Sequence, residues 1–535
     1  MARKPILLSW TSWSAVLLLV FVSGLRPARS QVLAQRNWAG SGVTVEPWWR
    51  RAVFYRIDPA RFQDSNGDGK GDLAGVVQRL DYVQMLGVDA LILKSAPVDG
   101  LAVDGFDDLV RSAAGSHVRV LVELGAPASQ GDDARYVAEA RQWLNQGAAG
   151  LYVPTRLLER VDGAGHIGLL LHQLRALTDS FPGGRVLLAD RPSTPDPGLL
   201  NALARETQLT ATRLTGTTAG GLRAELMAAL GEVPADAGGV DARLVKSSPT
   251  AGRRSRGRRP RVASVVLRHA ATGGETGLLL EAERVPGAVD GGAKAGLERA
   301  LAVMVLASRS AVVLEYGQEL GLEAAGTAGT QISDATGPLM QWTPSNLTRA
   351  PKLEVKTEET AVKPEGATYE GFQAFIRPLR KDFFPPPPMP VVVESDEVVP
   401  VAVDPSTLPG FTVGEFDAAL AAANGATANV AMEQADPASL LNLYKQLIEL
   451  HLEKATVRNG AEAVRDYDAL DAVVWVRRAP ASSRTSATVV VACNLSDKPV
   501  VLGGGVEGLR SLLRPGPVGE GGGVAPFGVL VGEGR

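Results

Sequence analysis

The stretch WWRRAVFYRIDPARFQDSNGDGKGDLAGVVQRLDYVQMLGVDALIL, residues 48–93, contains two short apolar runs with a periodic segment between them. Residues 53–57 and 90–93 have the length and composition of buried strands. Between them, apolar residues recur three and four positions apart, which predicts a helix with one buried face: Leu73, Val76, Val77, Leu80, Val83 and Leu86. Asp72 stands just before this face, where a helix N-cap belongs. The stretch therefore predicts a strand–helix–strand unit.

The same alternation continues on the C-terminal side of this unit. Strands are expected at residues 118–124, 150–153, 186–189 and 311–314, and helices at residues 106–112, 134–145 and 167–177. A helix that joins two parallel strands packs back onto their sheet as a right-handed crossover. The predicted fold class is therefore α/β, either a barrel or an open parallel sheet.

Composition limits the classes of function. The chain has 535 residues, 45% hydrophobic and 21% charged, which is typical of a globular protein with room for two or three domains. Its net charge is −3, and without the four bases of residues 1–30 it is 51 bases against 58 acids, or −7. This balance argues against general nucleic-acid binding. Cys493 is the only cysteine, which excludes an internal disulfide and a cysteine zinc site.

The N-terminus predicts an export signal. Arg3 and Lys4 precede an apolar run at residues 6–22, and Ala28 and Ser30 are small residues at the two positions that a signal peptidase reads. We expect a signal peptide over residues 1–30 and a secreted or periplasmic protein that begins at Gln31. The alternative is an uncleaved N-terminal membrane anchor.

Two segments interrupt the alternation. AGRRSRGRRPRV, residues 251–262, is a cationic loop that we interpret as a solvated surface loop. Residues 351–435 are rich in Pro, Glu and Val and are expected to form an irregular insertion. Helical periodicity returns over residues 436–456, and residues 460–535 have the short β-rich runs and Gly-rich turns of an antiparallel domain.

Several segments, in this order, resemble the alpha-amylase family. Residues 48–93 are similar to the opening of its oligo-glucosidase and sucrose-hydrolase barrels. EYGQELGL (315–322) resembles its strand-eight phrase, and GPLMQW (337–342) its Pro-Met-Gln-Trp segment with Leu339 inserted. NVAMEQADPASLLNLYKQLIEL (429–450) looks like its final barrel helix, and TVVVACNLSDKPVVL (488–502) and APFGVLV (525–531) like its C-terminal domain. The resemblance spans residues 48–531 and is weak at 200–300 and 351–425.

The resemblance implies a (β/α)8 TIM-type barrel, mainly residues 47–350, with the site at the carboxyl ends of the strands. The helix at 436–456 would complete the barrel, and the antiparallel β domain would follow. It also implies a role in carbohydrate metabolism with an α-glucan or oligosaccharide as ligand.

The loop after residue 63 predicts a calcium site. Oxygen donors alternate with glycines, so that one turn can surround a cation: Asp64, Asn66, Asp68, the Lys70 carbonyl and Asp72. The alternative is a polar turn in which Asp72 only caps the next helix. We favour calcium because the spacing resembles the family's own calcium loop.

The catalytic positions that the family resemblance implies have mostly changed. The nucleophile phrase aligns with GLYVPT (150–155), which puts Tyr152 at the arginine position and Pro154 at the nucleophile position. The acid/base position falls on Asp190, one methylene shorter than the glutamate of active members. Proline has no nucleophilic group, and a retaining glycosidase needs two carboxylates. The resemblance thus predicts a protein without the family's catalysis.

Other family positions agree with this interpretation. The Asp-x-x-x-Asn-His phrase aligns with ELGAPA (123–128) and keeps only Glu123, and the Asn-His-Asp phrase falls near LLEAER (279–284), with Glu281 and Glu283 but no histidine. We favour ordinary polar roles for Glu123 and Asp190. Tyr152 and Trp342 could either stack on a sugar or pack at the barrel mouth. The five histidines fall at no expected sugar site: His117, His166, His172, His269 and His451.

Three hypotheses for the function follow. The first is a non-catalytic carbohydrate-binding or scaffold protein with a structural calcium site. The second is an active α-glucan hydrolase or glucosyltransferase with rearranged carboxylates. The third is a membrane-anchored partner subunit, similar to the heavy chains of amino-acid transporters, although the extracellular cysteine that links those chains is missing before Trp48.

Overall fold

The computed structural model describes residues 47–94, 105–125, 133–159, 163–192, 196–231, 277–282, 285, 291–323, 337–343, 410–412, 424–465, 471–479, 487–502, 509–513, 518–519 and 523–534. Within them, eight parallel strands close into a barrel in which each strand pairs with the next and β8 pairs with β1. The strands are β1 (Val53–Ile57), β2 (Ala90–Lys94), β3 (Arg119–Glu123), β4 (Gly150–Val153), β5 (Val186–Asp190), β6 (Leu209–Leu214), β7 (Gly277–Ala282) and β8 (Ala311–Glu315). The predicted (β/α)8 fold is confirmed.

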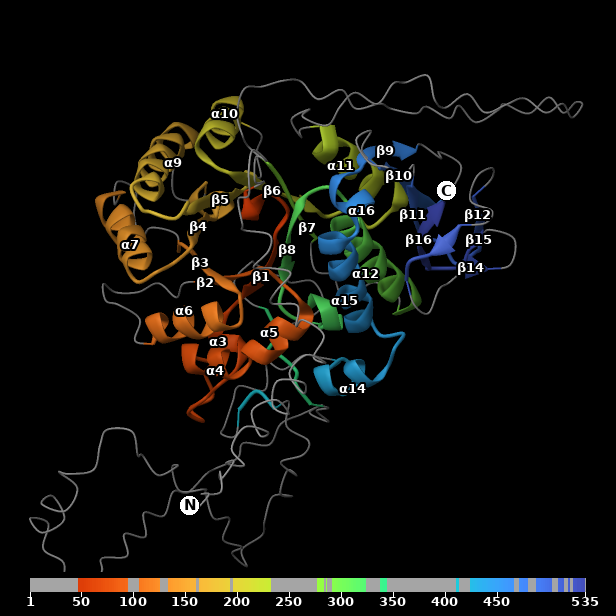
Figure 1. Cartoon of the computed structure of the whole chain (residues 1–535), viewed down its shortest axis with the longest axis horizontal. Helices are drawn as coiled ribbons and strands as arrows, with labels where there is room; N and C mark the ends of the chain where they lie inside the picture. Colours follow the sequence, from red (N-terminus) through yellow and green to blue (C-terminus); the bar gives the residue numbers. More distant parts are fainter. Residues whose placement is uncertain are drawn as a thin grey trace, which may run out of the picture.

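Helices surround the barrel (Figure 1). The longer ones are α4 (Leu73–Gln78), α5 (Leu80–Leu86), α6 (Phe106–Gly115), α7 (Asp133–Asn145), α9 (Ala164–Asp179), α10 (Pro197–Glu206), α11 (Ala219–Gly231), α12 (Gly291–Leu306) and α15 (Leu440–Glu453). Shorter ones are η1 (Trp48–Arg51), α3 (Pro59–Phe62), α8 (Thr155–Leu158), η3 (Gln318–Leu320), α14 (Val430–Ala435) and α16 (Ala455–Asn459). Residues of η1 and α16 line a hollow together with residues at the starts of the barrel strands.

The first predicted helix is two helices with a break at Arg79. This residue has φ −108° and ψ 13°, outside the helical region. Its guanidinium lies 4.2 Å from the ring centre of Trp342, and its Nε donates to Gln63 Oε1 at 2.6 Å. These partners are distant in sequence, so the apolar periodicity of residues 73–86 gave no sign of the break.

The barrel has an apolar interior and an apolar outer surface. Alternate strand residues, including Phe54, Ile92, Leu121 and Leu188, pack together inside, because successive side chains of a strand point to opposite faces. The intervening residues pack outward against the helices as one larger core. This alternation decides which residue of each strand end faces the barrel axis.

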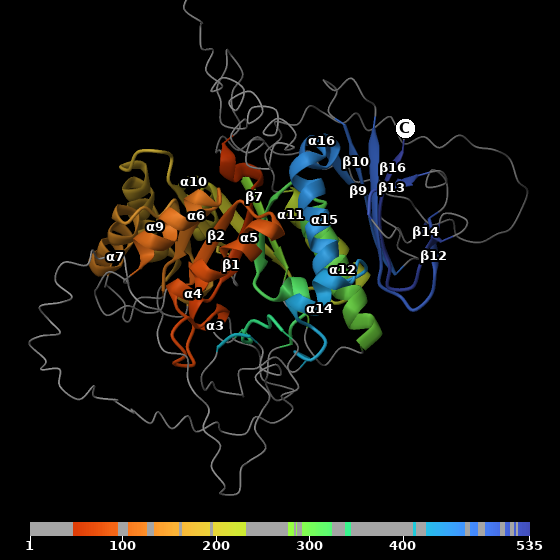
Figure 2. The same cartoon turned by 60° about the horizontal axis from the view of Figure 1, so that its bottom comes forward.

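A β domain follows the barrel. Its five-stranded antiparallel sheet has the order β13 (Arg510–Ser511), β16 (Val529–Gly534), β11 (Thr488–Asn494), β10 (Ala472–Arg478) and β9 (Ala461–Arg465). A small sheet joins β12 (Val500–Val501), β15 (Gly523–Val524) and β14 (Val518–Gly519). The large sheet packs against α12 through β11 and β16 and against α11 through β10, and it lies beside α12 in both views (Figures 1 and 2). The buried Arg477 of β10 donates to the carbonyl of Ala307, the residue after α12, and to Glu462 of β9.

Three sequence expectations need comment. Residues 430–435, inside the segment expected to be irregular, form α14, because Asn429 caps it by accepting the Met432 N–H at 3.0 Å. Residues 1–30 and 251–262 lie outside the described residues. In the part of the chain that is described, no helix has the length and apolar character needed to cross a membrane.

Candidate functional site

A layer of polar side chains closes the carboxyl end of the barrel interior. Each strand contributes the residue two positions beyond an interior residue, and we call these eight the strand-end layer: Arg56, Lys94, Glu123, Tyr152, Asp190, Arg213, Glu281 and Glu315. Three are cations and four are acids. The catalytic residues of barrel enzymes stand at this end of the strands, which makes the layer the candidate functional site.

Arg56 of β1 is at the centre of one half of the layer. Its Nε and Nη2 donate to the two carboxylate oxygens of Glu123 at 2.6 and 2.7 Å, and its Nη1 lies 3.5 Å from Glu315 Oε2. Lys94 Nζ lies 3.0 Å from the other Glu315 oxygen. Burial opposes the charge of Arg56, but Glu123 and Glu315 raise its pKa further above its ordinary value. Glu123 is thus a partner in a buried bidentate ion pair.

The other half of the layer is also paired. Arg213 Nε donates to Glu281 Oε1 at 2.8 Å, and both side chains are almost fully buried. Burial, and then the charge of Glu281, raises the pKa of Asp190 to about 6. The Tyr152 hydroxyl is buried without a hydrogen-bond partner in the described part of the chain. Burial, with Glu281 and Asp190 nearby, raises the Tyr152 pKa, so the phenol stays neutral.

Asp190 accepts hydrogen bonds from the segment that follows β4. Its Oδ1 accepts the backbone N–H of Thr155, and the Thr155 hydroxyl lies 2.8 Å from the same oxygen. Thr155 is the first residue of α8, and Pro154 at the N-cap position has no side chain that could cap it. Arg156 Nε lies 3.8 Å from Asp190 Oδ2. Asp190, at the end of the neighbouring strand β5, therefore caps α8 in place of Pro154.

Tyr152 and Trp342 have little exposed surface for a sugar. Tyr152 is 1% exposed and Trp342 is 5% exposed. The Trp342 ring packs edge-on against Phe62 and Tyr82, with centroids 5.2 and 5.1 Å apart, and its Nε1 donates to the Phe62 carbonyl. Of the two alternatives, packing describes both side chains in this structure.

The four histidines among the described residues lie away from the strand-end layer. His166 contacts Asp133 at 2.9 Å, His172 contacts Glu206 at 3.2 Å, and both stand on α9. His451 is buried on α15, where burial lowers its pKa to about 4. His117 is exposed before β3, and His269 and Glu283 lie outside the described residues. The layer thus contains no imidazole that could hold a sugar hydroxyl.

The predicted calcium loop is held by its own hydrogen bonds. Asp64 accepts the backbone N–H groups of Gly67 and Gly69 at 2.8 Å each, and both glycines have φ 82°. Asn66 Oδ1 accepts from the Asp68 N–H at 2.9 Å. Asp72 caps α4 by accepting the Gly75 N–H at 2.6 Å. Asp72 is therefore engaged as the cap, which was the alternative interpretation.

The loop still offers oxygen donors suited to calcium. Burial opposes the charge of Asp64, but hydrogen bonds from Thr412, Gly67 and Gly69 lower its pKa, so the carboxylate is ionised. The described residues include no group of three His, Cys, Asp or Glu side chains that could hold a metal ion. The oxygen donors that the loop offers are those of Asp64, Asn66, Asp68 and the Lys70 carbonyl, hard donors of the kind that calcium prefers.

Sequence reasoning missed four members of the layer: Arg56, Lys94, Arg213 and Glu315. The predicted strands at 90–93 and 311–314 ended at their last apolar residue, whereas β2 and β8 continue to Lys94 and Glu315. A charged residue directly after a buried apolar run was the available signal. This signal identifies the positions but not the residues with which their side chains form ion pairs.

Comparisons with known proteins agree with this architecture. A family model described as the catalytic domain of alpha amylase matches residues 56–99. The trehalose-6-phosphate hydrolase of Escherichia coli strain K12 is 38% identical over 95 residues, covering 14% of this chain and 17% of that protein. The oligo-1,6-glucosidase of Bacillus sp. strain F5 is 59% identical over 49 residues, covering 9% of this chain and 10% of that protein. The matches thus span less than a fifth of these curated relatives.

Solved structures match the whole fold. The alpha-glucosyl transfer enzyme XgtA has a TM-score of 0.57 at 18% identity, over 92% of this chain and 100% of that one. The isomaltulose synthase of Klebsiella sp. LX3 has a TM-score of 0.55 at 14% identity, over 92% and 100%. At these identities the likeness is one of fold, a closed barrel followed by a β domain. Residues 56–99 are thus similar to the alpha-amylase catalytic domain, and the chain shares the fold of these solved structures.

Proposed function

We propose that this chain is a non-catalytic member of the alpha-amylase family that acts in carbohydrate metabolism as an oligosaccharide-binding or scaffold protein. The observation that carries the proposal is the strand-end layer. Its acids Glu123, Glu281 and Glu315 are ion-paired, and Asp190 accepts hydrogen bonds at the start of α8. Pro154 stands where the family resemblance requires a nucleophile.

The chemistry of glycoside hydrolysis explains why this layer does not support turnover. The retaining reaction needs a carboxylate nucleophile and a second carboxyl group as acid/base, about 5 Å apart. Proline cannot form a glycosyl–enzyme bond. Asp190, with its pKa raised to about 6, could at most protonate a leaving group, and general-acid help contributes only about 10²–10⁴-fold.

The test is a hydrolysis screen beside a binding titration. Purified protein is incubated with maltose, isomaltose, sucrose, soluble starch and an aryl α-glucoside, and the same sugars are titrated by calorimetry. We expect no turnover above background. Saturable heat would support an oligosaccharide-binding role, and no heat would support a scaffold role. Hydrolysis of the aryl α-glucoside that is lost in Asp190→Asn would overturn the proposal and favour an active hydrolase with rearranged carboxylates.

We also propose that the chain is exported and that its loop at residues 64–72 binds calcium. Export rests on the basic start, the apolar run at 6–22 and the small residues before Gln31. N-terminal sequencing of protein from the native host tests it. A start at Gln31 supports secretion, and an intact N-terminus in the membrane fraction favours the anchored partner subunit instead.

A further inference from the structure

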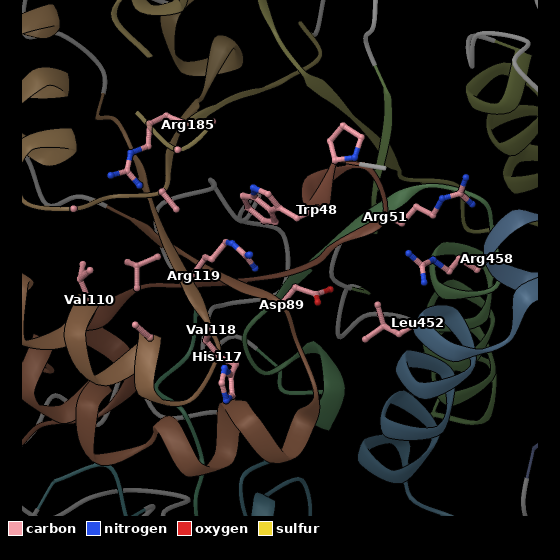
Figure 3. Close-up of a pocket in the computed structure, with 17 residues that line it drawn as sticks. Trp48, Arg51, Asp89, Val110, His117, Val118, Arg119, Arg185, Leu452 and Arg458 are labelled. Atoms are coloured by element: carbon pink, nitrogen blue, oxygen red, sulfur yellow. The ribbon is translucent and has the colours of Figure 1, made fainter. Parts of the chain in front are cut away.

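A hollow of about 400 Å³ opens at the end of the barrel opposite the strand-end layer. Its walls come from residues at the strand starts, such as Asp89 before β2, Arg119 at the start of β3 and Arg185 before β5. Trp48 and Arg51 of η1 and Arg458 of α16 complete it. Figure 3 shows Trp48, Arg119 and Asp89 in the middle, Arg51 and Arg458 on one side and Arg185 on the other. The hollow is separate from the family's active-site end.

The lining of the hollow is strongly cationic. Four arginines border it, Arg51, Arg119, Arg185 and Arg458, while the only acidic side chain among its lining residues is Asp89. Asp89 is also engaged with the fold, since its Oδ2 accepts the Val53 N–H at 2.9 Å. Four guanidinium groups against one carboxylate leave a formal charge of +3 on the lining.

Two of the guanidinium groups are held in ways that leave donors available. The Arg119 guanidinium lies over the Trp48 ring at 4.4 Å from its centre, which fixes the position of its plane. Burial lowers the pKa of Arg119 despite the nearby Asp89, which reflects a charge removed from water without full compensation. The Arg185 Nε is a buried donor with no hydrogen-bond partner in the described part of the chain. An anion in the hollow would accept hydrogen bonds from the guanidinium groups that line it.

The size and chemistry of the hollow select the kind of ligand. Its volume lies within the range of small-molecule pockets, roughly 300–1,000 Å³. The planar fork of a guanidinium matches a phosphate group bidentately, which a point charge does not. We propose that this hollow binds the phosphate group of a small phosphate ester, with Arg119 and Arg185 as donors. The site does not depend on whether the strand-end layer is catalytic.

Calorimetric titration of the full chain tests the site. Glucose 6-phosphate is the probe, and glucose is the uncharged control. We expect saturable heat with glucose 6-phosphate only, with an affinity that falls as KCl is raised. Arg119→Gln and Arg185→Gln should each weaken binding at least tenfold. Arg510→Gln, which removes an exposed arginine from the β domain, should leave the affinity unchanged. Melting temperatures identify any variant that does not fold, and Arg119→Lys then serves as the folded substitute.

A second measurement distinguishes a soluble phosphate ester from a lipid headgroup. The protein is co-sedimented with phosphatidylglycerol vesicles and, as control, with phosphatidylcholine vesicles. Binding to the anionic vesicles that Arg119→Gln and Arg185→Gln abolish would identify the headgroup phosphate as the source. The proposal is overturned if neither glucose 6-phosphate nor the anionic vesicles bind, if glucose binds equally well, or if both variants bind like the parent protein.

Discussion

The Asp190 carboxylate and the Thr155 hydroxyl lie 2.8 Å apart, and the Thr155 backbone N–H donates to the same carboxylate oxygen. Asp190 ends β5 and Thr155 begins α8, so this contact joins two neighbouring strand–helix units of the barrel. Asp190, which the sequence resemblance aligns with the family's acid/base position, therefore has a structural role. Pro154, between β4 and α8, makes that role necessary because it cannot cap the helix itself.

Restoring the missing nucleophile alone should not restore catalysis. In Pro154→Asp, the new carboxylate would stand beside Tyr152, which is neutral and cannot replace the guanidinium that the family uses to hold a nucleophile ionised. We expect hydrolysis of an aryl α-glucoside to stay at background, measured by release of the aryl alcohol. Clear turnover by this single variant would show that the remaining layer is catalytically competent.

The pH dependence of stability should contain a contribution from Asp190. Its pKa is raised from 3.8 to about 6 in the folded protein, so between these values the folded state binds more protons than the unfolded state. Stability from this group is thus complete below about pH 4 and is lost as the pH rises through about 6. We expect the difference in unfolding free energy between the parent protein and Asp190→Asn to change across this window, by up to about 3 kcal/mol. Urea unfolding at pH 4, 5, 6 and 7 measures it. A constant difference would contradict the raised pKa.

Removing Arg56 should destabilise the barrel strongly. Arg56→Met leaves the Glu123 carboxylate buried without its bidentate partner, which typically costs about 3–5 kcal/mol. The double variant Arg56→Met/Glu123→Leu should recover most of this loss, since no unpaired charge remains. Urea unfolding followed by circular dichroism measures both. Arg111→Met is the control, because that side chain is 70% exposed and should shift stability by less than about 1 kcal/mol. A single variant that behaves like this control would refute the stabilising role of the pair.

Calcium should raise the melting temperature through the loop at residues 64–72. A metal that binds only the folded state stabilises it by mass action. Asp68→Ala is the informative variant, since within the described residues the Asp68 side chain accepts hydrogen bonds from its own loop, from Asn66 Nδ2 and the Lys70 N–H. We expect the parent protein to melt higher in calcium than in EDTA, and Asp68→Ala to melt equally in both. Asp81→Ala, outside the loop, should keep the calcium response. If the parent protein itself shows no response, the loop is only a turn.

Local sequence patterns were sufficient to predict several elements of this protein. The period of the apolar residues placed the strands at 53–57 and 150–153 at their observed bounds, and the capping chemistry of Asp72 identified the start of α4. Side-chain identity alone showed that position 154 cannot be a nucleophile. Each of these inferences depends on a few adjacent residues. Interactions within such a short segment depend little on the rest of the chain, so the local sequence is enough to predict them.

Only the tertiary structure decided the partners at the two ends of the barrel. Arg56 and Glu123 are 67 residues apart, and Arg56 and Glu315 are 259 apart. They meet because strand register and barrel closure bring their inward-facing positions together. A fully buried strand is apolar on both faces, so its sequence does not show which residues point inward. The cationic hollow has the same origin, since its arginines come from separate parts of the chain that only the closed barrel places around one hollow.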